Sequence, residues 1–201
     1  GCRILLNDPP REAAGEKGFT GLDALCRECD VITFHTPLTR TGDFPTYHMG
    51  NADFFASLLL RPVIINAARG EVVDNEAWVH SLDEGTTSAA VVDTWENEPD
   101  ISSELLKRAL IATPHVAGYS ADGKANATRQ ALTALCRFFG ISPDFEILPP
   151  PLPPDMKPEK DAALRALQLY NPLNDTAALK ASPQSFEYLR GNYPLRRETW
   201  S

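Results

Sequence analysis

Apolar residues in this chain fall into short unbroken runs that alternate with segments of helical spacing. The runs predict strands at 3–7, 31–35, 62–68, 88–94 and 110–115. The segments of helical spacing predict helices at 22–29, 51–60, 74–85, 101–110 and 121–139. Strands that are apolar throughout and alternate with amphipathic helices are typical of a parallel sheet covered on both faces. The pattern therefore predicts an α/β fold with a doubly wound parallel sheet.

Polar and flexible residues mark the ends of several predicted helices. Asn51 and Asp74 are placed to cap helix N-termini, because their side chains accept hydrogen bonds from the first backbone N–H groups. Gly85 and Gly140 are placed to end helices, since glycine readily adopts a left-handed conformation. Asp74 is therefore expected to be a helix cap rather than a catalytic residue.

The composition changes near residue 143. From Pro143 to Pro158, seven of 16 residues are proline, which cannot continue a helix or a central strand. We expect a stiff extended linker at 141–160, between a first domain at 1–140 and a partial C-terminal domain at 161–201. That last segment has helical spacing at 162–172 and at 182–200. It is too short for an independent core, which favours a docking or dimerisation element.

Composition and charge narrow the function classes. The 201 residues are 43% hydrophobic and 23% charged, with a net charge of −8 and no Lys/Arg block, which argues against nucleic-acid binding. No apolar run approaches the roughly 18 residues that span a bilayer, and no signal peptide is evident, so a cytoplasmic location is expected. Cys26 and Cys29 form a C-x-x-C in a helical segment, and we expect structural cysteines.

Three residues suited to one reaction follow three predicted strands. Arg69 comes after IINAA, Glu98 lies in VVDTWENEP and His115 ends IATPH. Side chains at the carboxyl ends of parallel strands can converge on one cleft. There Arg69 would hold a substrate carboxylate, His115 would move a proton and a glutamate would keep the imidazole charged and oriented. Glu96 competes with Glu98 for that last role, and spacing alone cannot separate them.

Further candidates for cofactor and substrate contacts also follow predicted strands. Asp8 is placed to contact the ribose of a dinucleotide, and an acidic residue there favours NAD over NADP. Thr36 and Asp93 are expected to line the cofactor cleft, with Asp93 at the nicotinamide end. Gly118 would let the backbone approach a ligand, and Tyr119 would add a hydroxyl. Arg190, Arg196 and Arg197 lie in the C-terminal tail at 182–200. We expect them to form a solvated helix face rather than a phosphate site.

The segments HTPLT, INAARGEVVD, VVDTWENEP and TPHVAGY occur in the order and spacing of one enzyme family. In these segments the chain resembles the D-isomer-specific 2-hydroxyacid dehydrogenases. The resemblance implies a Rossmann-like NAD-binding domain, and it favours Glu98, the second acid of E-x-E-P, over Glu96. By motif it implies these roles: catalysis by Arg69, Glu98 and His115; NAD contacts by Asp8, Thr36, Asp93 and Gly118; substrate contacts by Tyr119 and Arg69.

Two further segments, NDPPR and FEYLRGNYPLRRE, resemble a smaller group within the family, whose members oxidise a phosphorylated hydroxy acid. They imply a homodimer whose small C-terminal α/β dimerisation element begins in the tail. No metal, nucleic-acid or membrane partner is implied. Alternatives within the same fold are an enzyme for glycerate or phosphoglycerate, and a non-catalytic NAD-responsive protein.

The chain departs from the family pattern at its start. It has no G-x-G-x-x-G, the loop that should lie about 20 residues before Asp8 and follow the first Rossmann strand. In the strand order 3-2-1-4-5-6 that strand would lie between the strands at 3–7 and 62–68. We therefore expect a fragment with its catalytic residues present, whose isolated form does not turn over.

Overall fold

Four of the five predicted strands form one parallel sheet in the computed structural model, which describes residues 1–194 and 196–200. The strands are β1 (Val31–Phe34), β2 (Val63–Asn66), β3 (Ala89–Val92) and β4 (Ile111–Ala112). They pair in the order β1-β2-β3-β4, and every pair is parallel. The predicted parallel α/β fold is confirmed.

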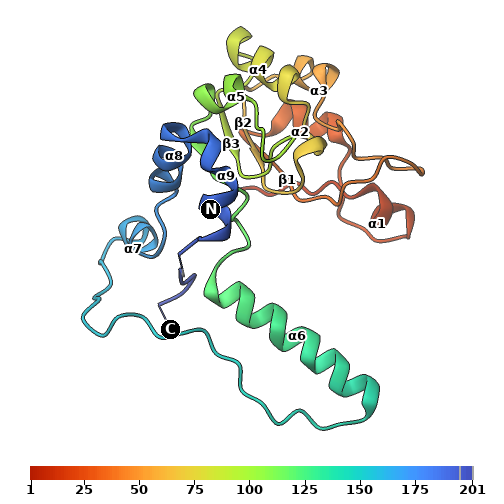
Figure 1. Ribbon diagram of the computed structural model, residues 1–201. Coiled ribbons are helices and arrows are strands. Elements are labelled where there is room, and N and C mark those ends of the chain that lie inside the picture. The colour runs from red at the N-terminus through yellow and green to blue at the C-terminus, as the bar shows by residue number, and fades with distance from the viewer. Residues whose placement is uncertain (195, 201) are drawn as a thin grey trace.

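The first 110 residues contain five α-helices, of which the last four gather on one side of this sheet while the first stands apart (Figure 1). They are α1 (Pro9–Ala13), α2 (Leu22–Glu28), α3 (Ala52–Ala56), α4 (Asn75–Glu84) and α5 (Ser103–Arg108), with the short 3₁₀ helix η1 (Gly70–Val72) before α4. Apolar side chains of α2 to α5 join alternate strand residues in one buried cluster, which includes Phe54, Trp78 and Leu105. Burial of these large side chains is the main stabilising contribution to this half of the molecule.

The two faces of the sheet are buried to different extents. Along each strand a buried residue alternates with one that is partly or fully exposed. Ile64 is fully buried against the helices, whereas 52% of the surface of Val31 on the other face is exposed. The apolar runs therefore identify strands correctly, but one face is only partly covered by the described residues.

The strand predicted at 3–7 is wrong: these residues are extended but belong to no strand. Their hydrogen bonds go to a loop rather than to a strand, from Thr20 N to the Leu6 carbonyl at 2.7 Å and from Asn7 Nδ2 to the Thr20 carbonyl at 2.7 Å. Arg3 pairs with Glu28 of α2. A strand needs a hydrogen-bonded neighbour, and none of the described strands lies beside this segment.

The described sheet has no gap beside β2, where the first Rossmann strand is expected from the sequence. β1 pairs directly with β2, with Val31 opposite Val63 and Phe34 opposite Asn66. The position beside β2 is therefore filled by β1. Among the described strands, the open edge of the sheet is the outer edge of β1.

The predicted helix ends are confirmed where the structure tests them. Asn51 caps α3 and Asp74 caps α4 through their side chains. Gly85 ends α4, and Gly140 ends the long helix α6 (Ala121–Phe139), both in the left-handed conformation. Helix α1, which the hydrophobic pattern did not predict, begins with two prolines and is capped by Asp8. Its sequence carries the signal of a cap followed by proline.

The C-terminal part leaves the sheet and returns to it. Helix α6 projects from the body, and the proline-rich linker, which forms neither helix nor strand, leads back to α7 (Figure 1). The helices that follow are α7 (Ala162–Leu169), α8 (Pro172–Ala181), η2 (Pro183–Ser185) and α9 (Phe186–Gly191). The α/β character expected for this element is not seen in its described residues, which are helical. Pro172 separates α8 from α7, because proline starts a helix well and cannot continue one.

Helix α8 closes the outer edge of β4. The Ala112 N–H donates to Thr176 Oγ1 at 3.0 Å, so a side chain from α8 satisfies a backbone group that a neighbouring strand would otherwise pair. Lys180 donates to the Ala109 carbonyl at 2.7 Å, and Leu179 and Phe186 are fully buried. Helices α8 and α9 are thus packed onto the sheet and share its core.

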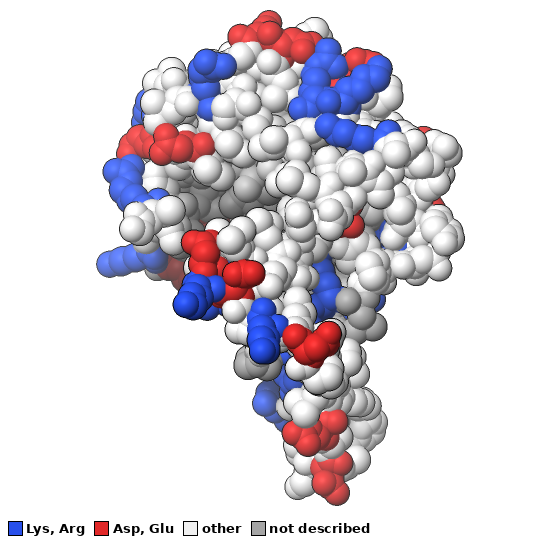
Figure 2. All heavy atoms as spheres, turned by 90° about the vertical axis from the view of Figure 1, so that its left-hand side faces the viewer, with Lys and Arg blue, Asp and Glu red and all other residues white. Residues whose placement is uncertain are grey.

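The other sequence expectations concern cysteines, charge and the membrane. All four cysteines are free; Cys26 is buried, and burial raises the pKa of the Cys29 thiol, which disfavours the reactive thiolate. Cationic and anionic side chains are interspersed over the face seen in Figure 2. Among the described residues, no helix is both long enough and apolar enough to cross a membrane.

Replacing Asp122 with asparagine should lower stability at neutral pH and matter less in acid. Asp122 accepts two hydrogen bonds from Arg197, at 2.9 and 3.1 Å, and this contact lowers the pKa of its carboxyl. A lowered carboxyl pKa contributes stability above the ordinary value of about 4, and this stability is lost as the pH falls through the folded-state pKa. Urea unfolding between about pH 7 and about pH 3 should show the wild-type and D122N midpoints converging in acid. A pH-independent difference would contradict this.

Candidate active site at the strand ends

The three residues proposed for catalysis follow three neighbouring strands. Arg69 follows β2, Glu98 follows β3 and His115 follows β4. Because β2, β3 and β4 are adjacent and parallel, their carboxyl ends meet at one edge of the sheet. The structure places all three residues at this edge of the sheet.

Glu98 and His115 are in direct contact. His115 Nδ1 lies 2.9 Å from Glu98 Oε2, and the two side chains are 27% and 18% exposed. The other carboxylate oxygen of Glu98 accepts a hydrogen bond from Trp95 N at 2.8 Å, which fixes the carboxylate. A hydrogen on Nδ1 suits the carboxylate, so Nε2 remains available to accept a proton. This pair has the geometry of an oriented general base.

Glu96 has a different partner, which resolves the ambiguity between the two glutamates. His48 Nε2 lies 2.6 Å from Glu96 Oε1, and Asn75 N donates to Glu96 Oε2 at 2.8 Å. Glu96 therefore ties the loop after β3 to the start of α4. Glu98 is the acid that contacts His115, as the family resemblance implied.

Arg69 is held by its backbone and keeps its side chain at the surface. It is exposed and forms no ion pair with any described residue. Its Nη1 donates to the Ala68 carbonyl at 2.6 Å. A guanidinium without a carboxylate partner, at the edge that carries His115, is suited to bind a carboxylate ligand.

Asn66 organises the Arg69 loop, and the sequence reasoning missed it. This fully buried residue at the end of β2 donates to the Arg69 carbonyl at 3.0 Å and accepts from Ala68 N at 3.2 Å. The signal in the sequence is a single amide that ends an otherwise apolar run. Buried polar side chains are hydrogen-bonded, so an asparagine there indicates local backbone groups that need partners.

Replacing Asn66 with alanine should destabilise the protein by about 1–3 kcal/mol, because buried backbone groups lose their partner. The Arg69 loop should also exchange its amide hydrogens faster, since the bond to its carbonyl is lost. Urea unfolding and hydrogen exchange measure the two effects. Asn51→Ala, which removes only the cap of α3, should leave exchange in the Arg69 loop unchanged. Equal exchange in N66A and wild type would contradict the assigned role.

Asp93 organises the segment that carries His115. Its buried carboxylate accepts from Thr113 Oγ1 at 2.6 Å, from Val116 N at 2.8 Å and from Ala117 N at 3.1 Å. His115 N donates to the Asp93 backbone carbonyl at 2.9 Å. The expected cofactor contact of Asp93 stays a prediction, and the structure adds this local role to it.

The other predicted binding residues lie at the same strand ends, apart from Asp8. Thr36 follows β1 and is half-buried. Gly118 is exposed, with no atom within 4 Å of the place a Cβ would occupy. Tyr119 packs edge-to-face against Tyr193 and lies under Lys124 Nζ at 4.6 Å. The Asp8 carboxylate accepts from Arg11 N at 3.1 Å, as a helix cap does.

Two of the three tail arginines are not on a helix. Arg196 and Arg197 follow α9 and are half-buried: Arg196 binds the loop after His115, and Arg197 binds Asp122 at the start of α6. The solvated helix face expected for them is therefore wrong. Arg190 does lie on α9, 4.0 Å from Glu187. Among the described residues, no group of three or more His, Cys, Asp or Glu side chains has the geometry to hold a metal ion.

The residues present fit the nicotinamide end of NAD. The open backbone at Gly118 lies three residues after His115, and the carboxylate of Asp93, at the end of the neighbouring strand, binds the two N–H groups between them. A backbone without a side chain permits close approach of a flat ring, and a carboxylate can accept from its amide. The sequence contains no G-x-G-x-x-G, so this fit concerns the nicotinamide end alone.

A family model described as D-isomer specific 2-hydroxyacid dehydrogenase, NAD binding domain, matches residues 1–117. The chain belongs to this family. Dehydrogenase relatives were also found among curated proteins. An erythronate-4-phosphate dehydrogenase of Bacteroides thetaiotaomicron is 51% identical over 199 residues, and the one of Porphyromonas gingivalis is 42% identical over 209 residues.

These alignments cover 98% of this chain in both cases, but 57% and 56% of the relatives. The chain thus spans somewhat more than half the length of the curated dehydrogenases that it matches. Their activity as whole proteins is therefore a proposal for this chain.

Solved dehydrogenase structures share the fold. The D-mandelate dehydrogenase of Rhodotorula graminis gives a TM-score of 0.55 at 25% identity, over 73% of this chain and 43% of that one. The D-lactate dehydrogenase of Lactobacillus jensenii, solved with NAD⁺, gives 0.53 at 25% identity, over 71% and 46%. Both similarities support the assignment of the parallel sheet to the Rossmann-like NAD-binding fold of this family.

Proposed function

We propose that this chain carries the catalytic acid/base pair of an NAD-dependent dehydrogenase that oxidises 4-phospho-D-erythronate to 2-oxo-3-hydroxy-4-phosphobutanoate. This reaction would serve pyridoxal phosphate biosynthesis, in the cytoplasm, in a homodimeric enzyme. The observation that carries the proposal is the 2.9 Å contact of His115 with Glu98, on an edge shared with Arg69, which forms no ion pair with the described residues. The similarity to erythronate-4-phosphate dehydrogenases over 98% of the chain supports the choice of substrate.

Each of the three proposed catalytic residues has one task in the reaction. Arg69 binds the substrate carboxylate through its guanidinium. His115 Nε2 accepts the proton of the C2 hydroxyl while the C2–H bond breaks and the C2–O bond becomes a carbonyl. Glu98 stabilises the imidazolium that forms, since a carboxylate beside an imidazole favours its charged state. Bound NAD would supply the acceptor for the hydride that leaves C2.

The remaining predicted contacts complete the site. We propose that Thr36, Asp93 and Gly118 contact NAD, and that Tyr119 contacts the substrate. Asp8 would bind the adenosine ribose, a role that requires its carboxylate to leave or share the cap of α1. NADH binding to the 201-residue chain, measured by calorimetry, should show one site whose affinity falls in D93N. Equal affinities would contradict the contact with Asp93.

A chimeric enzyme tests the substrate and the chemistry together. In it, this chain replaces the matching segment of the Bacteroides thetaiotaomicron relative. We expect NADH to form with 4-phospho-D-erythronate and much more slowly with D-glycerate or 3-phosphoglycerate. Preference for either glycerate would support the alternative family enzyme. NADH binding without turnover on any of the three would overturn the proposal in favour of a non-catalytic NAD-responsive protein.

A further inference from the structure

The peptide segment just after His115 is held from both sides by opposite charges. On one side the Asp93 carboxylate accepts from the N–H groups of Val116 and Ala117, at 2.8 and 3.1 Å. On the other side Arg196 Nη2 donates to the carbonyls of the same two residues, at 3.0 and 2.8 Å. The peptide group that joins Val116 to Ala117 therefore lies between a carboxylate and a guanidinium, and each of its two neighbours is bound by one of them.

Arg196 is itself fixed by an aromatic cage. Its guanidinium carbon lies 3.9 Å from the ring centroid of Tyr170 and 5.4 Å from that of Tyr193. Both tyrosine hydroxyls donate to Asp175 Oδ2, at 2.8 and 2.7 Å, and Arg196 Nη1 donates to Tyr193 Oη at 3.1 Å. Burial raises the pKa of both phenols, which keeps them protonated as donors to Asp175. The planar guanidinium is thus held in one orientation.

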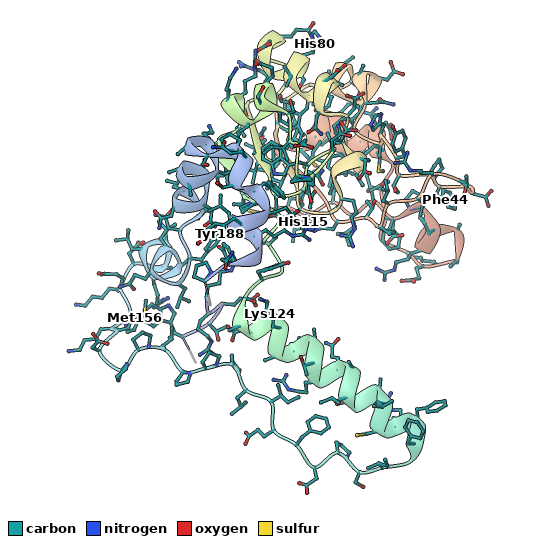
Figure 3. The ribbon with its side chains drawn as sticks, viewed as in Figure 1. Phe44, His80, His115, Lys124, Met156 and Tyr188 are labelled. Carbon is teal, nitrogen blue, oxygen red and sulfur yellow. The ribbon has the colours of Figure 1, made fainter. Side chains whose placement is uncertain are left out.

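The residues around Arg196 hold the next part of the same loop. The Arg196 carbonyl accepts from Ala121 N at 2.8 Å, at the first residue of α6. Glu198 contacts Ser120 Oγ, and its backbone N–H donates to Asp122 Oδ2 at 2.8 Å. Backbone and side-chain contacts of the tail therefore cover the connection from His115 to α6 (Figure 3).

His115 needs such support because its backbone is unfavourable. It adopts a φ of +55°, in the left-handed region that costs a residue with a Cβ about 1–2 kcal/mol. Relaxation of this φ would swing the imidazole away from Glu98. The contacts of Asp93 and Arg196 at the two following residues oppose that relaxation.

We propose that Arg196 is a positioning residue, which keeps His115 in contact with Glu98 by binding the backbone carbonyls after it. The proposal rests on the function proposed for His115. It assigns to the tail a task in orienting the acid/base group, although the tail lies about 80 residues further along the chain. The ligand of the Arg196 guanidinium is then the chain itself, which leaves it unavailable as a phosphate site.

The test is the hydrogen-bonded Nδ1–H proton of His115 in the 201-residue chain, observed by NMR after ¹⁵N labelling of histidine. Wild type should show this low-field resonance, and H115Q identifies it by its absence. In R196M it should be lost or broadened by exchange with water. Arg165→Met, at an exposed position of α7, should leave it unchanged. An unchanged resonance in R196M would overturn the proposal.

A second variant covers the case in which R196M does not fold, as judged by circular dichroism. R196K keeps a charge and a long side chain, but its single nitrogen cannot bind the two carbonyls and also replace the Nη1 bond to Tyr193 and the planar stacking on Tyr170. The resonance should therefore weaken again. If R196K retains the wild-type resonance, the positioning role is wrong. In the chimera, R196K should lower kcat by about 10- to 100-fold with little change in KM.

The two proposals can fail separately. If the chimera is inactive on every substrate but R196M abolishes the resonance, the positioning of His115 stands and the proposed function fails. If H115Q abolishes turnover while the Arg196 variants leave both the resonance and kcat unchanged, only the positioning role fails.

Discussion

Replacing Gly70 with alanine should cost at least about 3 kcal/mol of stability or prevent folding. A Cβ on Gly70 would lie 1.9 Å from the Trp95 carbonyl oxygen, 2.1 Å from its carbon and 2.7 Å from Glu96 N. These are backbone atoms and cannot rotate away as a side chain can. The segment after β2 that carries Arg69 and Gly70 would therefore have to separate from the segment after β3 that carries Trp95 and Glu96. Overpacking a core typically costs about 1–3 kcal/mol, and a clash with backbone falls at or beyond the upper end. Urea unfolding followed by circular dichroism measures the loss.

Gly118→Ala is the matched control for this effect. No atom lies within 4 Å of the Cβ that alanine would add at Gly118, so its stability should stay within about 0.5 kcal/mol of wild type. The variant should instead weaken NADH binding, if the backbone there approaches the cofactor. Equal stability of G70A and G118A would contradict the close packing of the two loops.

Replacing His115 with glutamine should lower kcat of the chimera on 4-phospho-D-erythronate by about 10²- to 10⁴-fold. Glutamine can still donate to Glu98, but it cannot accept a proton near neutral pH. In the proposed reaction Arg69 binds the substrate carboxylate, so we expect KM to change little. The measurement is the steady-state rate of NADH formation over a range of substrate concentrations.

His80→Gln controls for the loss of a histidine. His80 is exposed on α4 and lies at the far end of the molecule from His115 (Figure 3). Its kcat and KM should equal those of the parent chimera. A kcat for H115Q within about threefold of the parent would be too small for a lost general base and would contradict the assignment of His115.

The general layout of the fold was predictable because it depends on local patterns. Short apolar runs separated by helical segments allow few arrangements other than a parallel sheet with crossover helices. That topology alone places Arg69, Glu98 and His115 at one edge, whatever the details of the loops. Asn51, Asp74, Gly85 and Gly140 were also predictable, since a cap depends on its immediate neighbours.

The parts that could not be predicted depend on contacts between distant segments. The run at 3–7 has the composition of a strand, but composition cannot supply a neighbouring strand. Spacing could not separate Glu96 from Glu98, because the choice depends on His48 and His115, which lie in other loops. Nothing in the local sequence shows that Arg196 stacks on Tyr170 and binds the backbone near His115.

The tail contacts have a consequence for the order of events during synthesis. The helix crossovers of the sheet join neighbouring strands. The bonds of Arg196 to the loop after His115, and of Arg197 to Asp122 in α6, instead connect residues 75 to 80 positions apart. Ribosomes add about 5–20 residues per second, so a nascent chain can form its sheet several seconds before residue 196 is made. We therefore expect the imidazole to reach its working position last, when the rest of the sheet has already folded.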